Sequence, residues 1–192
     1  MGRVLWGIWL LSREDALRLV REYVKNDRLV KHMLAVEAIM RALARRLGED
    51  EELWGLTGLV HDIDYELTKD NPDRHGLVSV EILKGKVPEE TLNAIRAHNP
   101  RIGRAPETAM EKALVASDAI SGLLIACALV MPHKKLSEVR VKTVKGKFKS
   151  KDFARGVNRE SILLCEELGI ERTEFFEIAL KALQEIAGQL GL

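Results

Sequence analysis

The spacing of apolar residues predicts helices along nearly the whole chain. Ser12 is a helix N-cap with Asp15 at the N3 position, and apolar residues then recur at helical spacing as far as Tyr23. Strand-like alternation is confined to Val139–Val144. The fold class is therefore all-α, with roughly seven to nine helices in one bundle. Beyond the first helix, the predicted helices cover residues 28–47, 51–62, 75–84, 89–98, 108–131, 153–168 and 173–190.

Composition agrees with a compact globular domain. The chain has 192 residues, of which 46% are hydrophobic and 31% charged, and this excludes a disordered or low-complexity protein. No apolar run is expected to span a membrane, so we expect no membrane partner. The two cysteines, Cys127 and Cys165, are too few for a disulfide framework, and they favour buried thiols in a reducing cytoplasm.

Charge is balanced overall but uneven along the chain. The net charge is +1, which by itself does not favour nucleic acid as a partner. Residues 134–159, however, hold ten Lys and Arg residues against only Glu138 and Asp152. This segment is either a solvated face, as most charge runs are, or a lid that faces substrate phosphates. A nucleic-acid patch is the least favoured interpretation, because Phe148 and Phe153 are too few aromatic residues for a stacking platform. In the lid interpretation, the candidate substrate-binding residues are Lys142, Lys149, Arg155 and Arg159.

Several histidines and aspartates occupy positions where a helix would otherwise be apolar. Burying an isolated carboxylate is expensive, and a buried imidazole needs a partner for each ring nitrogen. One such residue is most often a satisfied core histidine, but five sites of this kind on five separate predicted helices favour convergence on metal. The six residues at these sites are His32, His61, Asp62, His75, His98 and Asp118.

The types of ligand narrow the choice of metal. Imidazoles and carboxylates without a thiolate suit iron or manganese, with cobalt, nickel, zinc or magnesium as alternatives. Six protein ligands exceed the needs of one catalytic ion, so we expect two divalent ions that share a bridging carboxylate. Asp62, directly after His61, is suited to span both ions.

These residues resemble the H…HD…D pattern of the HD superfamily of metal-dependent phosphohydrolases. The stretch Leu59–Ile63 (LVHDI) and the stretch Ala116–Ile120 (ASDAI) are similar to two of that family's motifs, and the resemblance covers about residues 28–126. His75 and His98 stand where the binuclear branch carries two further histidines. The resemblance implies an HD-like bundle around a buried metal site, with one ion held by His32, His61, Asp62 and Asp118 and a second by His75 and His98.

The chain also departs from part of that family. Asp64 and Tyr65 stand where members with the HDIGK motif have Gly and Lys, which weakens a link to the cyclic-dinucleotide phosphodiesterases. The candidate catalytic residues are Asp62 and Asp64, the latter either an outer base or a structural carboxylate. His133 has no matching role and is interpreted as a surface residue.

The expected activity is hydrolysis of a phosphoric ester or anhydride by a metal-activated water. The expected partner is a small phosphorylated substrate, such as a nucleotide, and a homodimer is left open. Two alternatives remain, an HD-type di-iron oxygenase and a non-catalytic metal-binding regulatory module. The expected organisation is an extension at residues 1–11, an HD-type metal-binding domain at 12–132, and a basic segment with C-terminal helices at 133–192 that pack on the same domain.

Overall fold

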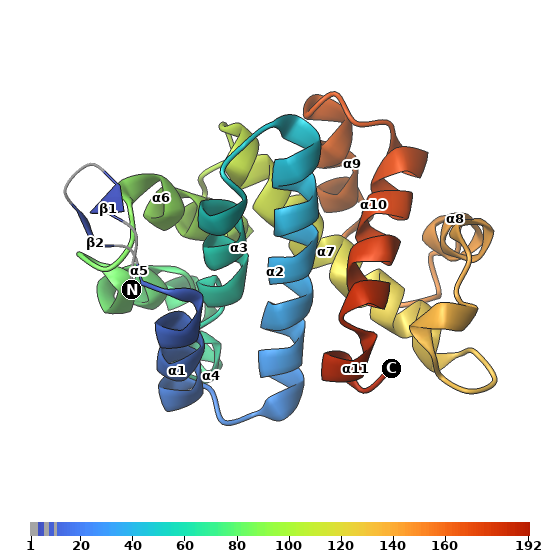
Figure 1. The fold of residues 1–192 in the computed structure, drawn as a ribbon, viewed down its shortest axis with the longest axis horizontal. Coiled ribbons are helices and arrows are strands. Elements are labelled where there is room, and N and C mark those ends of the chain that lie inside the picture. Colours follow the sequence, from blue (N-terminus) through green and yellow to red (C-terminus); the bar gives the residue numbers. More distant parts are fainter. Residues whose placement is uncertain (1–3, 6–7, 10) are drawn as a thin grey trace.

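The structure is a computed structural model that describes residues 4–5, 8–9 and 11–192, and within them it is a helical bundle (Figure 1). Val4–Leu5 (β1) and Ile8–Trp9 (β2) form a two-residue antiparallel ladder. Three short 3-10 helices join the α-helices, at Pro72–Arg74, Pro100–Ile102 and Leu136–Glu138. The α-helices are α1 (Arg13–Tyr23), α2 (Asp27–Leu47), α3 (Glu51–Val60), α4 (Tyr65–Thr68), α5 (Leu77–Leu83), α6 (Glu89–His98), α7 (Ala109–Leu129), α8 (Val141–Lys149), α9 (Arg159–Glu167), α10 (Arg172–Glu185) and α11 (Ala187–Leu190).

The predicted all-α class is confirmed. Without the two four-residue helices α4 and α11, the described part of the chain has nine α-helices, within the expected range. Ser12 caps α1 by accepting a hydrogen bond from the backbone N–H of Asp15, and α6 has the predicted bounds. Gly48 ends α2 in the left-handed region, at a φ of 78° that L side chains rarely adopt.

One helix was not predicted. Residues 139–144, which alternate like a short strand in the sequence, lead into α8 and include its first turn. The reason is that Val144 and Phe148 lie four residues apart and both pack inward, with the Phe148 ring 5.4 Å from that of Phe176 in α10. The spacing of four residues between Val144 and Phe148 is that of one helical face, so these apolar residues are buried by a helix and not by a strand.

The hairpin of α2 and α3 forms the centre of the bundle. Gly58 in α3 lies so close to α2 that an added Cβ would be 3.0 Å from the backbone of Glu37. A side chain at this position would push the two helices apart by a few tenths of an ångström, so glycine favours the close approach that brings the residues after α3 against the middle of α2. Glu37, itself buried, accepts hydrogen bonds from Arg13 in α1 and Arg41 in α2, and this holds α1 on the hairpin.

Helix α7 crosses the molecule beside this hairpin (Figure 1). Its start is a capping box, in which Thr108 and Glu111 exchange hydrogen bonds with each other's backbone N–H groups. By length and composition alone α7 could cross a membrane, and it was not singled out from the sequence. In the fold, 56% of that stretch is buried, as in the core helix of a globular bundle.

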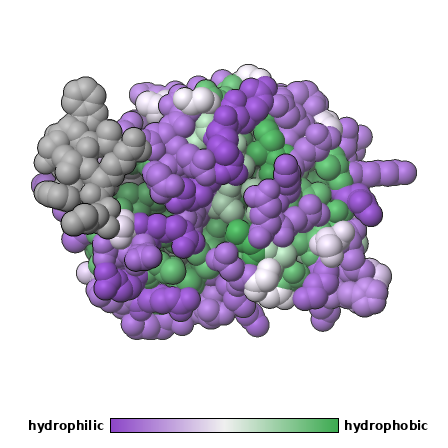
Figure 2. Space-filling view, viewed as in Figure 1, coloured by the Kyte–Doolittle hydropathy of each residue, from purple (hydrophilic) through white to green (hydrophobic). Residues whose placement is uncertain are grey.

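The C-terminal helices extend the bundle on the other side of α2 and α7. Helix α10 packs against α2, α9 packs against α7, and α8 contacts both α7 and α10. The space-filling view shows that hydrophilic side chains cover most of this end of the molecule (Figure 2). The metal-ligating candidates lie elsewhere, where α2, α3 and α7 meet the segment of α4 to α6.

Candidate metal centre

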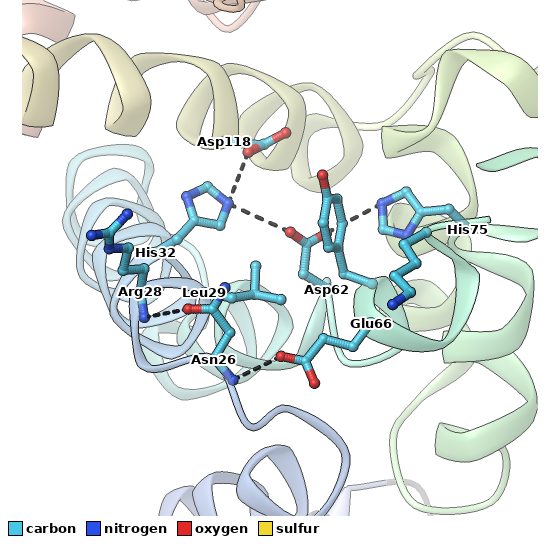
Figure 3. Close-up of a pocket in the computed structure, with 10 residues that line it drawn as sticks. Asn26, Arg28, Leu29, His32, Asp62, Glu66, His75 and Asp118 are labelled. Atoms are coloured by element: carbon cyan, nitrogen blue, oxygen red, sulfur yellow. Dashed lines mark hydrogen bonds and ion pairs between the residues drawn. The ribbon is translucent and has the colours of Figure 1, made fainter. Parts of the chain in front are cut away.

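The six predicted ligands come together in one place although they span 87 positions of the chain. His32 projects from α2 and Asp118 from α7, and His98 is the last residue of α6. His75 lies in the loop before α5. His61 and Asp62 lie in the turn that follows α3. Figure 3 shows His32, Asp62, His75 and Asp118 pointing toward one another around a shared space.

Asp62 is the residue that all four imidazoles approach. Its Oδ1 lies 3.3 Å from each of the Nε2 atoms of His61, His75 and His98. Its Oδ2 lies 3.6 Å from Nε2 of His32. Nε2 of His32 is also 3.1 Å from Oδ1 of Asp118. Asp62 therefore occupies the bridging position between two sets of side chains.

The ligand atoms form two groups that share Asp62. In each group the ligand atoms lie within 4.8 Å of one another, close enough to hold one ion. The Nε2 atoms of His75 and His98 are 3.0 Å apart. One group contains His32, His61 and Asp62, and the other contains Asp62, His75 and His98. Asp118 joins the first group through its contact with His32.

The second ring nitrogen of every histidine is held by the fold. Nδ1 of His61 donates to the carbonyl oxygen of Gly58 over 2.8 Å, and Nδ1 of His98 donates to that of Ile95. Because a carbonyl only accepts, these rings carry their proton on Nδ1 and direct an Nε2 lone pair into the site. This is the usual arrangement behind metal-ligating histidines.

His32 and His75 are oriented in the same way by side chains. Nδ1 of His32 lies 3.2 Å from Oγ of Ser121, which donates its own hydrogen to the carbonyl oxygen of Asp118 and therefore accepts from the ring. Nδ1 of His75 donates to Oδ1 of Asp64 over 2.8 Å. All four Nε2 atoms are thus directed at the shared space around Asp62.

Asp64, a candidate catalytic residue from the sequence, is buried behind His75. Its Oδ2 accepts hydrogen bonds from the backbone N–H groups of Gly76, at 2.8 Å, and Ser79, at 2.9 Å. With Oδ1 bound to His75, both oxygens are engaged and neither faces the open side of the site. The geometry favours the structural of its two predicted roles: Asp64 positions His75 and the start of α5.

Three supporting residues were missed by the sequence reasoning. Asn99 donates from Nδ2 to the carbonyl oxygens of Pro72 and His75, which fixes the loop that carries His75. Gly76 has a φ of 83°, and an added Cβ would lie 3.0 Å from the carbonyl oxygen of Ile95. Ser121 lies one helical turn after Asp118. The sequence offered one signal for these supporting roles, which is closeness to a predicted ligand. Gly76 and Asn99 directly follow His75 and His98, and Ser121 is three residues after Asp118.

The electrostatics of the site come from carboxylates and imidazoles packed together. Burial acts to raise the pKa of Asp62, but His61, His75 and His98 outweigh it and hold this pKa well below its ordinary value. Burial also acts to lower the pKa of His75, yet the carboxylates of Asp62 and Asp64 raise it to about 10. For His61, burial dominates and lowers the pKa, so this ring stays neutral and able to bind metal.

The residues present fit a divalent metal centre. Nε2 of His61 is buried and has no hydrogen-bond partner, an expensive arrangement that a bound cation would relieve. The donor set of imidazole nitrogens and carboxylate oxygens suits first-row transition metals, as the sequence predicts. The number and identity of the ions remain predictions.

A cavity of about 740 Å³ opens above Asp62. That volume is within the usual range for small-molecule sites. The cations Arg28 and Lys69 lie on its wall together with Tyr65, whose ring packs edge-on against His75 at 5.5 Å. The full lining is Asn26, Arg28, Leu29, His32, Asp62, Tyr65, Glu66, Lys69, His75 and Asp118.

The structure does not bring the four cations predicted to bind substrate into this lining. Lys142 and Lys149 are exposed on α8, and Arg155 pairs with Asp152 at the surface. Arg159 donates to the backbone carbonyl oxygens of Ser150, Phe153, Ala154 and Val157, so it organises the loop before α9. The cations that do line the cavity, Arg28 and Lys69, were not predicted.

The remaining candidates for chemistry lie away from the centre. Cys127 and Cys165 are buried free thiols, and burial raises their pKa values to about 11 and about 12. Neither thiol is therefore a ready nucleophile. His133 is exposed and bonded to Glu138, in agreement with its interpretation as a surface residue.

Comparison with known proteins yields one family and one kind of relative. The HD domain family matches residues 29–129. Ribonuclease Y of Lawsonia intracellularis is 28% identical over 157 residues, which cover 79% of this chain but 30% of the relative. Ribonuclease Y of Acholeplasma laidlawii is 31% identical over 97 residues, which cover 50% of this chain and 18% of the relative. The chain thus spans less than a third of the length of these relatives. No solved structure matches it significantly.

Proposed function

The chain belongs to the HD domain family, and on that basis we propose that it is a metal-dependent phosphohydrolase with a nucleotide-like or other small phosphorylated substrate. The observation that carries the proposal is the position of Asp62 between two groups of ligand atoms that face one cavity. The relatives named Ribonuclease Y support hydrolysis of phosphoric esters in particular.

The chain's own residues would hold two divalent ions. Asp62 would be shared by both ions, with His32, His61 and Asp118 holding one and His75 and His98 holding the other. When bound, such ions lower the pKa of a water molecule and polarise a phosphoryl oxygen. Asp64, Ser121 and the carbonyl oxygens behind the rings keep the imidazoles in position, so little reorganisation is needed when substrate binds.

The cavity supports a substrate with more than one charged group. Arg28 at the start of α2 and Lys69 after α4 are exposed, and neither forms an ion pair in the described part of the chain, although Glu66 lies within electrostatic reach of Lys69. Each can donate a charge-assisted hydrogen bond to a phosphate that lies above the centre. Tyr65, half exposed at 50%, offers an aromatic face beside them for a base or sugar.

The test is reconstitution of metal-stripped protein. The protein is loaded in turn with Mn²⁺, Fe²⁺, Co²⁺, Ni²⁺, Zn²⁺ and Mg²⁺, and elemental analysis gives the ions bound per chain. Hydrolysis is then measured on a chromogenic phosphodiester, a nucleotide panel and a short RNA. We expect two ions per chain and turnover with at least one redox-inert ion.

The same experiment separates the alternatives. Turnover that requires iron and molecular oxygen would replace the hydrolase with an HD-type oxygenase. Metal binding without turnover of any phosphoric ester, by any ion, would favour a regulatory module. Asp70→Asn is a suitable control variant, because Asp70 is exposed and lies outside the cavity lining.

A further inference from the structure

Residues 134–159 form a basic lobe at the end of the molecule where α8 lies (Figures 1 and 2). The two faces of α8 explain why the lysine side chains of this lobe lie on the surface. Its apolar side chains Val144 and Phe148 pack inward, and this leaves the other face to solvent. On that face the exposed residues Lys142, Lys145 and Lys149 follow one another at three and four positions, so they form one stripe.

Two of the three charges of this stripe have no counterion in the described part of the chain. Lys142 and Lys149 have no polar partner there, whereas Lys145 donates to the hydroxyl of Thr173 and has the Glu171 carboxylate within electrostatic reach. The lobe's two carboxylates are engaged elsewhere, Glu138 with His133 and Asp152 with Arg155. The side chains of the exposed residues that flank the stripe form no ion pair in the described part of the chain; these residues are Lys134, Lys135, Arg140 and Lys151.

We propose that the basic lobe binds the sugar-phosphate backbone of a single-stranded nucleic acid. Unpaired exposed cations attract a polyanion by releasing its condensed counterions, and a neutral or singly charged ligand gains little from them. The contacts would be to phosphates, because the stripe offers no exposed aromatic ring for stacking; Phe148 is packed against Phe176. Relatives of this chain are named Ribonuclease Y, which favours RNA as the strand.

The position of the lobe predicts how long the strand must be. Asp118 at the metal centre and Leu129 near the lobe are both in α7, eleven residues apart. At 1.5 Å per residue they are ~16 Å apart along the helix, and this is roughly five nucleotides at a 3.4 Å repeat. A strand of more than about five nucleotides could contact both regions, whereas a mononucleotide reaches only one.

The inference extends the proposed function but is tested independently of it. The variant Lys145→Gln/Lys151→Gln removes two charges from the lobe without touching the cavity lining. The matched control, Arg21→Gln/Lys84→Gln, removes two exposed charges, with no carboxylate partner, from α1 and the end of α5. Both are compared with the unmodified chain for binding of a labelled 15-nucleotide RNA at several salt concentrations.

We expect the lobe variant to bind this RNA about tenfold more weakly at low salt, with little dependence on sequence. The slope of log K against log salt should become shallower by about 1.4, because each lost contact to a single strand contributes roughly 0.7. The control should bind as the unmodified chain does. Hydrolysis of a small phosphodiester should be equal in all three proteins.

Other outcomes overturn the inference. Equal losses of RNA affinity in both variants would mean that net charge alone attracts RNA. Unchanged RNA affinity in the lobe variant would show that the lobe does not bind RNA. Leu129 and Val130 are half exposed just before the lobe, so vesicles with anionic lipid are the competing probe. Binding to vesicles but not to RNA would replace the nucleic acid with a membrane. RNA binding that persists in Asp62→Ala, while hydrolysis fails in every protein, would refute the hydrolase and leave the lobe's role intact.

Discussion

The candidate metal centre and the basic lobe are both rich in charged side chains, but the two regions differ in whether those side chains are buried and paired. At the centre, carboxylates and imidazoles are buried together, and each has a partner or faces the shared space around Asp62. In the lobe, Lys142 and Lys149 stand in solvent with no partner in the described part of the chain. Buried charge must be compensated, whereas exposed charge is stable when left unpaired.

This difference decides what each region can be used for. A buried, mutually compensated cluster holds its geometry and suits a small ion and the chemistry at one atom. An exposed stripe of flexible lysines has little geometric precision and suits a long polyanion. Function should therefore depend steeply on single residues at the centre and only in a graded way on those of the lobe.

The largest effect is expected at the shared carboxylate. Asp62→Ala removes the ligand between both groups, and the metal centre should lose several kcal/mol of transition-state stabilisation, or roughly 10³-fold in kcat. Elemental analysis and phosphodiester hydrolysis check this. Near-normal turnover with two ions still bound per chain would refute the bridging role.

The next test separates the two groups of ligands. His75→Ala should reduce metal content toward one ion per chain, because it affects only the group formed with His98. His32→Ala should instead damage the group that contains His61. Metal titration by calorimetry distinguishes the two variants. If His75→Ala keeps full stoichiometry and rate, the centre holds one ion and His75 is structural.

A smaller loss is expected when Asp64 is changed. Asp64→Asn introduces an amide NH2 among donors from His75, Gly76 and Ser79, so the His75 ring loses part of its support. Metal affinity or activity should fall by about 10- to 100-fold. The pH dependence of the remaining activity should keep its shape, since Asp64 is not placed as the base. Asp70→Asn is the control and should behave as the unmodified chain.

The cavity cations should affect substrate binding and leave the metal in place. Arg28→Gln should raise KM for a nucleotide by about tenfold, the cost of one charge-assisted contact of about 1.4 kcal/mol. Its metal content should not change. An Arg28 variant with unaltered KM for every charged substrate would show that Arg28 does not contribute to substrate binding. Lys69→Gln is the parallel test of the other cation in the cavity lining.

The smallest effects concern stability in the basic lobe. Arg159→Gln leaves backbone carbonyl oxygens of the loop before α9 without their donor and should lower the free energy of unfolding by about 1–3 kcal/mol. Lys142→Gln removes an unpaired surface charge and should change it by less than about 0.5 kcal/mol. Thermal melting compares them. Equal effects would show that the lobe's cations are interchangeable.

Much of the fold could be predicted because its signals are local. Apolar spacing, the Ser12 cap and the left-handed Gly48 each act within a few residues, and they define α1, α2 and α6 closely. No element was predicted at Val139–Val144, because a short apolar alternation fits a strand and a helix equally well. Packing of Phe148 on Phe176 decides between them, and those residues are 28 positions apart.

The sequence by itself identified the six candidate ligands that the fold brings together, because histidine and aspartate on apolar helical stripes need an internal partner whatever the fold. Only the tertiary structure decided which cations reach the cavity. Arg28 and Lys69 line it, while the basic lobe lies beyond the C-terminal end of α7, away from Asp118. The close approach of α3 to α2 at Gly58 brings Asp62 beside His32, and the turn at Gly76 aligns His75 with Asp64. Composition shows how much charge a segment carries, but proximity depends on how helices pack, and that is a property of contacts between distant residues.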